Sequence, residues 1–148
     1  MEQQGLQQME IQVSRLERYP DYAALLNRHI GTTRQQLQRL EQALGAAGES
    51  ISSIEGTVAG TVGATVHGMF QDETLKNLYA GYAYQYEQIG AYRSLIAIAE
   101  APGKTAHVSA FWRSVQEEEQ AAQDLGSLIK PVTRRHVELT TSGDKADR

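Results

Sequence analysis

Four polar side chains interrupt the apolar faces of segments that have the residue spacing of amphipathic helices. Glu2, Thr33, Gln85 and Glu118 each fall where the three- and four-residue spacing of their neighbours calls for an apolar residue. A buried polar group without a partner costs about 1–3 kcal/mol. Four such groups on inward faces therefore predict a shared hydrogen-bond network or the remains of a binding site. The alternative is simple solvent exposure, with Glu118 turned outward and Glu2 at a frayed helix end.

Two of these residues are expected to lie at the same height. Gln85 stands 17 residues before Pro102, and Glu118 stands 16 residues after it. If two antiparallel helices meet near Pro102, their side chains at these distances lie side by side. Residues of this kind on four helices could hold a pair of metal ions. Proteins that do so use one Glu from each of two helices and Glu-x-x-His from each of the others. The positions three residues before the four histidines hold Leu26, Ala64, Lys104 and Thr133, so the sequence contains no Glu-x-x-His.

Scarce proline and abundant Gln, Glu, Ala and Leu predict that helices position these side chains. Four helices are expected, with apolar faces within residues 6–16, 26–44, 75–99 and 108–129. Their limits are set by Tyr19-Pro20-Asp21, by Gly45 and Gly48, by Asp72 and Glu73, by Pro102-Gly103 and by Pro131. Residues 134–139 add at most a last turn or two. The polar residues from 140 onward are expected to be disordered.

Segment 49–70 joins the two halves of the chain. It is rich in Gly, Ser, Thr and Val and carries no charged residue after Glu55. We interpret it as a long Gly-rich crossover that contains a short, tightly packed helix. Two helix pairs joined by one long crossover are typical of ferritin-like bundles. The sequence therefore predicts an all-α, antiparallel ferritin-like four-helix bundle over residues 1–131, with a C-terminal extension and disordered tail over 132–148. A simple up-down bundle with a wandering middle loop is the alternative.

The composition limits the function classes. The chain has 148 residues, no cysteine and a formal net charge of −4. The absence of cysteine excludes disulfides, thiolate metal sites and cysteine nucleophiles. A mixed, slightly acidic charge argues against a protein that coats nucleic acid. No apolar run reaches the roughly 20 residues of a membrane helix, and the first ten residues do not resemble a signal peptide. We expect a cytoplasmic protein without nucleic-acid or membrane partners. Without a nucleophile elbow or a phosphate-binding glycine pattern, we expect it to be non-enzymatic.

Three stretches carry a family resemblance, namely HIGTTRQQLQRLEQAL, YAYQYEQIGAYRSLIAIAE and QEEEQAAQDL. With YPDYAALLNRHI and VHGMF, they resemble the bacterial ferritin-like family typified by YciE and YciF, most closely the YciE branch. The resemblance covers roughly residues 1–131. It implies a ferritin-like bundle, commonly dimeric, in a protein associated with stress responses. It also implies carboxylates that resemble a di-metal centre in many members, and a first helix that usually begins earlier than it does here.

The sequence departs from this family at the carboxylates. Where the family typically has acids, the second helix has Thr32, the third has Gln85 and Gln88, and the fourth has Gln123, while Glu2, Glu117 and Glu118 are retained. Amides and hydroxyls keep the hydrogen bonding but lack the negative charge that a hard cation needs. We therefore predict a degenerate site without metal or cofactor. In it, glutamine amides pair with Glu118, Glu87 and tyrosines.

Two other functions stay open. One is a metal-binding redox or iron-handling protein that holds iron or manganese with Glu2, Glu87, Glu117 and Glu118 and with ligands from another chain. The other is a helical interaction module. Five tyrosines gather on the third helix, at positions 79, 82, 84, 86 and 92. We interpret them as an aromatic face at the core edge or at a dimer interface, and we expect a homodimer.

Overall fold

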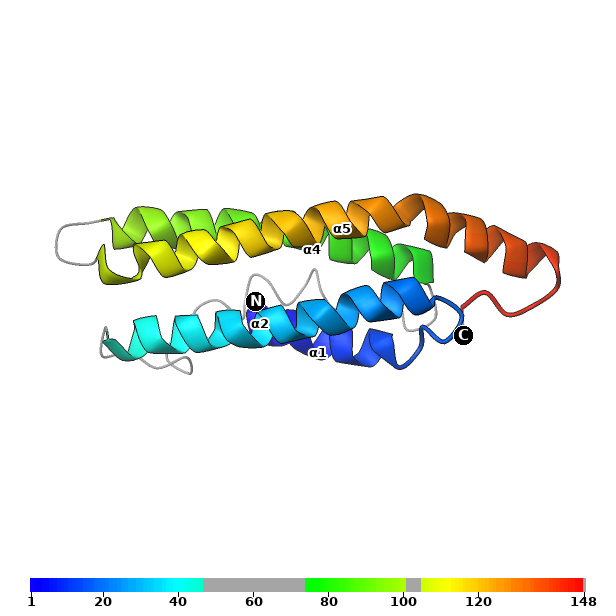
Figure 1. Ribbon diagram of the computed structural model, residues 1–148, viewed down its shortest axis with the longest axis horizontal. Coiled ribbons are helices and arrows are strands. Elements are labelled where there is room, and N and C mark those ends of the chain that lie inside the picture. Colours follow the sequence, from blue (N-terminus) through cyan, green and yellow to red (C-terminus); the bar gives the residue numbers. More distant parts are fainter. Residues whose placement is uncertain (47–73, 101–104, 148) are drawn as a thin grey trace.

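Figure 1 shows the protein as a computed structural model that describes residues 1–46, 74–100 and 105–147, and these described residues form four α-helices. The helices are α1 (Glu2–Val13), α2 (Pro20–Ala46), α4 (Thr74–Ala99) and α5 (Val108–Thr141), with a short 3-10 helix, η1 (Thr105–His107), before α5. The described residues contain no strand, so the prediction of an all-α fold is confirmed for them. The predicted crossover 49–70 lies outside the described residues. Helix α1 lies along α2, and α4 lies along α5.

The expected break at residues 19–21 is confirmed, because α2 begins at Pro20. The fixed φ of proline suits the first position of a helix, where its missing N–H costs nothing. Asp21 adds a carboxylate to the first turn, near the positive end of the helix dipole. Helix α2 then runs to Ala46, close to the predicted end at Gly45 and Gly48. The predicted signals at 72–73 and 102–103 lie outside the described residues.

The prediction that the fourth helix ends before Pro131 is wrong, because α5 continues through Pro131 to Thr141. A proline inside a helix removes one hydrogen bond and costs about 3 kcal/mol. Pro131 and Ser127, whose carbonyl loses its partner, are both exposed, so water can hydrogen-bond to that carbonyl. Val132 and Leu139 beyond the proline are buried. Burying two such side chains contributes about 1.5–3 kcal/mol each, which offsets the loss.

Residues 142–147 also differ from the expectation of a disordered tail. The chain reverses at Gly143, whose φ of 80° is a conformation that favours glycine. Ala146 is then buried among the apolar residues at this end of the bundle. In Figure 1 the last turns of α5 slope toward the connection between α1 and α2, and the segment that follows returns to it.

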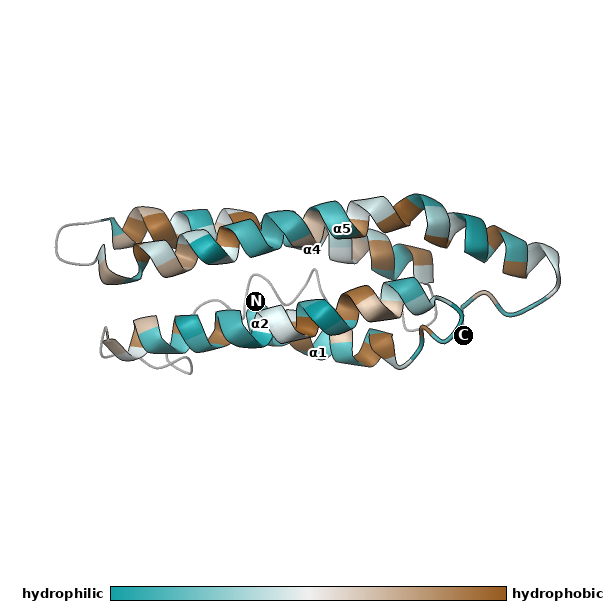
Figure 2. Ribbon diagram, in the orientation of Figure 1, coloured by the Kyte–Doolittle hydropathy of each residue, from teal (hydrophilic) through white to brown (hydrophobic). Residues whose placement is uncertain are grey.

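Two apolar clusters form the core. The first core consists of Leu16, Tyr19, Tyr22, Leu25, Leu26, Leu78, Leu125, Val132, Leu139 and Ala146. The second core consists of Ile89, Tyr92, Ile96, Ala99, Phe111 and Val115. Along α2 and α5, buried polar residues stand between the parts that contact the two cores. Teal and brown alternate along the helices in Figure 2, as expected for amphipathic helices with one buried face.

Candidate functional site: a polar layer between two cores

All four polar residues that the spacing placed on inward faces are buried. The exposed fraction is 5% for Glu2, 6% for Thr33, 7% for Gln85 and 4% for Glu118. The prediction of inward polar residues is therefore confirmed, and the alternative of solvent exposure is wrong. Together with the other buried polar residues at this level, they form what we call the polar layer. Its further members are His29, Gln36, Gln88 and Ser114, with Arg39 and Glu117 at its edge.

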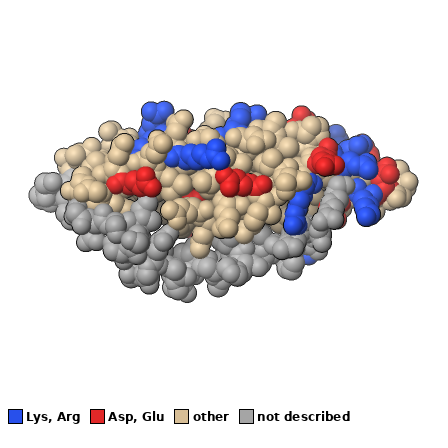
Figure 3. Space-filling model, turned by 90° about the horizontal axis from the view of Figure 1, so that it is seen from below, with Lys and Arg blue, Asp and Glu red and all other residues tan. Residues whose placement is uncertain are grey.

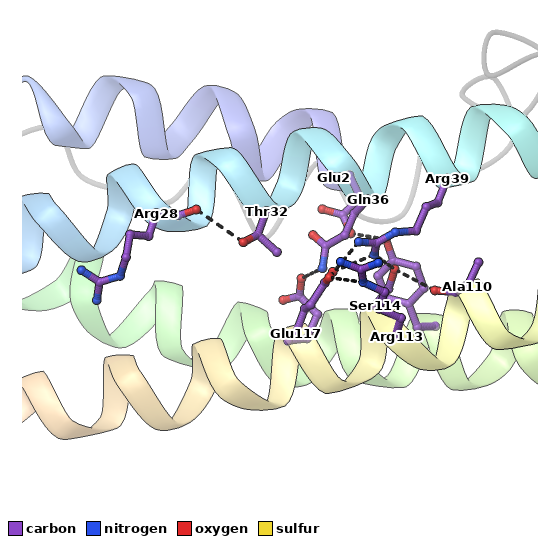
Figure 4. A network of polar contacts seen from close by, with 11 residues as sticks. Glu2, Arg28, Thr32, Gln36, Arg39, Ala110, Arg113, Ser114 and Glu117 are labelled. Carbon is purple, nitrogen blue, oxygen red and sulfur yellow. Dashed lines mark hydrogen bonds and ion pairs between the residues drawn. The ribbon is translucent and has the colours of Figure 1, made fainter.

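An arginine from α2 makes the strongest contact in the layer (Figure 4). Nη1 and Nη2 of Arg39 donate to the two carboxylate oxygens of Glu117 on α5, over 2.6 and 2.7 Å. Nη1 also donates to Oγ of Ser114 over 2.8 Å. Arg113 donates from Nε to the same carboxylate over 3.1 Å. The paired geometry of Arg39 and Glu117 matches the planar guanidinium to the planar carboxylate, which is the stronger form of ion pair.

The two fully buried carboxyl groups have neutral partners. Nε2 of Gln36 donates to Oε1 of Glu118 over 2.6 Å, and the hydroxyl of Tyr92 donates to Oε1 of Glu2 over 2.6 Å. The nearby amide of Gln88 also acts to lower the pKa of Glu2. The expected pairing of a glutamine amide with Glu118 is thus confirmed, but the amide belongs to α2 and not to α4.

Burial controls the charge of these carboxyl groups. Burial, with the nearby Glu2, raises the pKa of Glu118 to about 8, although its hydrogen bond from Gln36 acts in the opposite direction. Burial also raises the pKa of Glu2, against the lowering effect of the Tyr92 hydrogen bond. Glu118 is therefore largely protonated at neutral pH. The layer carries less negative charge than its number of carboxyl groups suggests, and the charge of Glu117 is balanced by Arg39.

Several buried polar atoms in the layer have no hydrogen-bond partner among the described residues. They include Oε2 of Glu2, Oε1 of Gln36 and both ring nitrogens of His29. Burial lowers the pKa of His29 to about 4, so the ring is neutral at neutral pH. A neutral imidazole still carries one N–H, and this donor has no acceptor. The layer is therefore only partly satisfied, which costs stability.

Three candidates from the sequence lie apart from this arrangement. The hydroxyl of Thr32 donates to the carbonyl of Arg28 over 3.4 Å, and Figure 4 shows this pair away from the main network. Gln123 and Glu87 are exposed. The reason is helix geometry. Gln123 stands five positions after Glu118, so its side chain leaves α5 about 140° around the helix axis from that of Glu118. Gln85, by contrast, is a buried member of the layer, and it also lines a pocket with Gly5 and Tyr84 among others.

Gln36, Arg39 and Ser114 were not anticipated. Gln36 follows Thr33 by three residues and Ser114 precedes Glu118 by four, so both lie on the predicted inward faces and could have been found from the spacing. Arg39 gave no such signal, because a cation in a Gln- and Arg-rich helix usually points into solvent.

The acids that the described residues bring to the polar layer are poor ligands for a di-metal centre. Within residues 1–46, 74–100 and 105–147, no group of three or more His, Asp or Glu side chains is arranged to hold a metal ion. One retained acid, Glu117, is already bound by two arginines, and another, Glu118, has the pKa of a group that holds its proton. A divalent cation requires anionic oxygens that are free to bind it.

The tyrosines of α4 are divided between core and surface. Tyr92 lies in the layer, and Tyr84 packs against Gly5 of α1, where a Cβ atom would stand 2.8 Å from Cε1 of the ring. Tyr79 and Tyr86 are exposed, and the Tyr86 ring lies edge-on to that of Tyr82, with 5.3 Å between ring centres. Tyr82 and Tyr84 are half-buried and so form the predicted aromatic face at the core edge, whereas the other three tyrosines are buried or exposed.

The surface has mixed charge on the face seen in Figure 3. Lys and Arg side chains are interspersed there with Asp and Glu, and the described residues on this face form no large block of one sign. None of the described helices is both long enough and apolar enough to cross a membrane.

The comparison with known proteins finds a family match over most of the chain. Residues 1–138 match the family described as a domain of unknown function (DUF892). No solved structure matches the chain significantly. The family match includes the part of α5 just beyond Pro131 and stops before residues 142–147. Because this match covers well over half of the 148 residues, the chain belongs to the DUF892 family.

Proposed function

We propose that this protein is a non-enzymatic, ferritin-like antiparallel bundle with a stress-response role, in which an internal ion pair and hydrogen bonds replace a di-metal centre. The observation that carries the proposal is Arg39. Its guanidinium supplies a fixed positive charge between α2 and α5, on the carboxylate of Glu117. A cation that belongs to the chain neutralises this acid without a metal ion. The resemblance of the helices to the YciE and YciF family supports the ferritin-like and stress-response parts.

The second support is the chemistry of the other acids. Glu118 gains a hydrogen bond from an amide, and its raised pKa favours the neutral form. Glu2 binds the hydroxyl of a tyrosine. These hydrogen bonds join α2 to α5 and α1 to α4, but such groups offer a metal ion little negative charge.

The direct test is metal content. The protein is expressed with added iron and manganese, and bound metal is measured by mass spectrometry. We expect background metal and an unchanged melting temperature when either metal is added. Near-stoichiometric metal would refute the proposal and support the iron-handling alternative.

A pair of variants tests the role of Arg39. Arg39→Gln removes a charged, two-pronged contact that is largely shielded from water, and we expect it to lower the free energy of unfolding by about 2–3 kcal/mol. The matched control is Arg34→Gln on the same helix, where the ion pair with Glu10 is exposed and is worth less than about 1 kcal/mol. Urea denaturation of both variants and the parent protein measures the two losses. Equal losses would show that Arg39 has no special role.

We further propose that the protein forms a homodimer through the outward face of α4. Tyr79 and Tyr86 are seven residues apart, lie on one face of the helix and are 44% and 55% exposed. Tyrosine is enriched in protein interfaces. Light scattering should give twice the chain mass, Tyr86→Glu should give the monomer, and Trp112→Glu on α5 should leave the dimer intact. A monomeric parent protein would refute this proposal.

The stress-response role has its own measurement. The abundance of the protein in its native cells is compared before and after oxidative, osmotic and heat challenge. A constant abundance under all three would count against this part.

A further inference from the structure

The C-terminal segment 142–147, which we call the hook, contacts two parts of the molecule that are far apart in sequence. After Thr141 the chain reverses at Gly143, and the N–H of Asp144 donates to the carbonyl of Leu139 over 2.9 Å. This turn directs the next residues back over the first core, where Ala146 is buried. The hook follows residue 138, the last residue of the family match.

The first contact of the hook is with the connection between α1 and α2. The hydroxyl of Tyr19 donates to the carbonyl of Ala146 over 2.6 Å. The hydroxyl oxygen of Tyr19 also lies 3.3 Å from Nδ1 of His136 on α5. Tyr19 is itself buried in the first core. The contact therefore combines a buried hydrogen bond with the packing of the Ala146 methyl group.

The second contact is with the beginning of α4. Oδ1 of Asp147 accepts the N–H of Thr74 over 2.9 Å and also lies 3.8 Å from Nδ1 of His136. The first N–H groups of a helix have no partner within the helix, and this end of the helix dipole is positive. The carboxylate of Asp147 satisfies both the hydrogen bond and the charge.

From these contacts we propose that the hook is a clasp that closes one end of the bundle by joining the α1–α2 connection to the start of α4. Neighbouring residues of one short segment make the two contacts, through the carbonyl of Ala146 and the side chain of Asp147. His136 on α5 lies beside both. Loss of the hydrogen bond between Tyr19 and Ala146 therefore also weakens the hydrogen bond between Asp147 and Thr74, because both depend on the position of the hook. Release of the clasp is a local opening of this end, separate from the unfolding of the whole protein.

Hydrogen exchange on the full chain tests this coupling. Tyr19→Phe removes only the hydroxyl that binds Ala146, and we expect amide exchange over Thr74–Leu78 to become about fivefold faster, the ratio for one lost hydrogen bond. Asp147→Asn should give an effect of similar size. Because one opening event breaks both contacts, the two losses add in the free energy of opening, and the double variant should exchange about 25-fold faster than the parent protein.

The matched control is Tyr22→Phe. Tyr22 is buried in the same core, but its hydroxyl bonds to Gln12 within the α1–α2 pair, so exchange over Thr74–Leu78 should be unchanged. Exchange around Ile96, at the other end of α4, should be unchanged in every variant. The proposal is overturned if Tyr19→Phe leaves exchange over Thr74–Leu78 unchanged, if the double variant exchanges no faster than the faster single variant, or if exchange at Ile96 rises equally.

Discussion

Replacing Glu118 by glutamine should stabilise the protein, and the gain should grow as the pH rises. The pKa of Glu118 is about 8 in the folded protein, above its ordinary value of 4.5. Between these two values the unfolded chain loses the proton while the folded protein keeps it. The contribution of Glu118 to the free energy of unfolding therefore falls as the pH increases from 4.5 to 8. Glutamine resembles the protonated carboxyl in shape, keeps a hydrogen bond with Gln36 and does not ionise.

The magnitude follows from the interval between the two pKa values. At about 1.36 kcal/mol per pH unit, the contribution of Glu118 falls by about 3 kcal/mol by pH 7 and by about 5 kcal/mol once the pH exceeds 8. Glu118 is only 4% exposed, so water does little to reduce this penalty. The difference between the variant and the parent should therefore rise from near zero at pH 4.5 to these values.

The assay is urea denaturation at pH 5, 6, 7 and 8 at constant ionic strength. The control is Glu119→Gln, which changes the same group at an exposed position where it pairs with Arg93, and which should cost less than about 1 kcal/mol. A Glu118→Gln variant that is less stable than the parent at pH 8 would refute the reasoning. That result would mean that the fold stabilises the charged carboxylate.

Two further predictions concern His29 and the glycines. His29 has a folded pKa of about 4, below its ordinary 6.5, so the unfolded chain gains the proton first and stability falls by about 3 kcal/mol as the pH drops from 6.5 to 4. His29→Met should abolish this loss in the same urea series; a difference in the free energy of unfolding between this variant and the parent protein that stays constant from pH 6.5 to 4 would contradict the prediction. Gly5→Ala brings a methyl group against Tyr84 and should cost about 1–3 kcal/mol, whereas Gly31→Ala adds a methyl in open space and should gain about 0.5–1 kcal/mol. Thermal melting measures both, and a stabilising Gly5→Ala would contradict the close packing of α1 and α4.

The spacing of apolar residues was enough to predict the helices, because each buries one face. The same spacing predicted the burial of Glu2 and Glu118, since a helix that buries its neighbours must bury them too. It did not predict their partners, which depend on how helices far apart in sequence align. The proline rule failed at Pro131, because the burial of residues beyond it outweighs the local penalty. The burial of Arg39 was not predicted, because a charged side chain is buried only with a partner, and the partner Glu117 lies on a helix far away in the sequence.

The polar layer has a consequence for how the helices are aligned along their lengths. An apolar face repeats about every seven residues, so α2 and α5 could slide by two turns and still match apolar residues. In such a slipped arrangement, Arg39 would lose Glu117, and Gln36 would lose Glu118. Unpaired buried charge costs several kcal/mol, which penalises the slipped states more than the imperfect hydrogen bonding penalises the native one. The layer thus lowers stability but fixes a single register, and substitutions that make it apolar should yield a more stable bundle with less well-defined helix alignment.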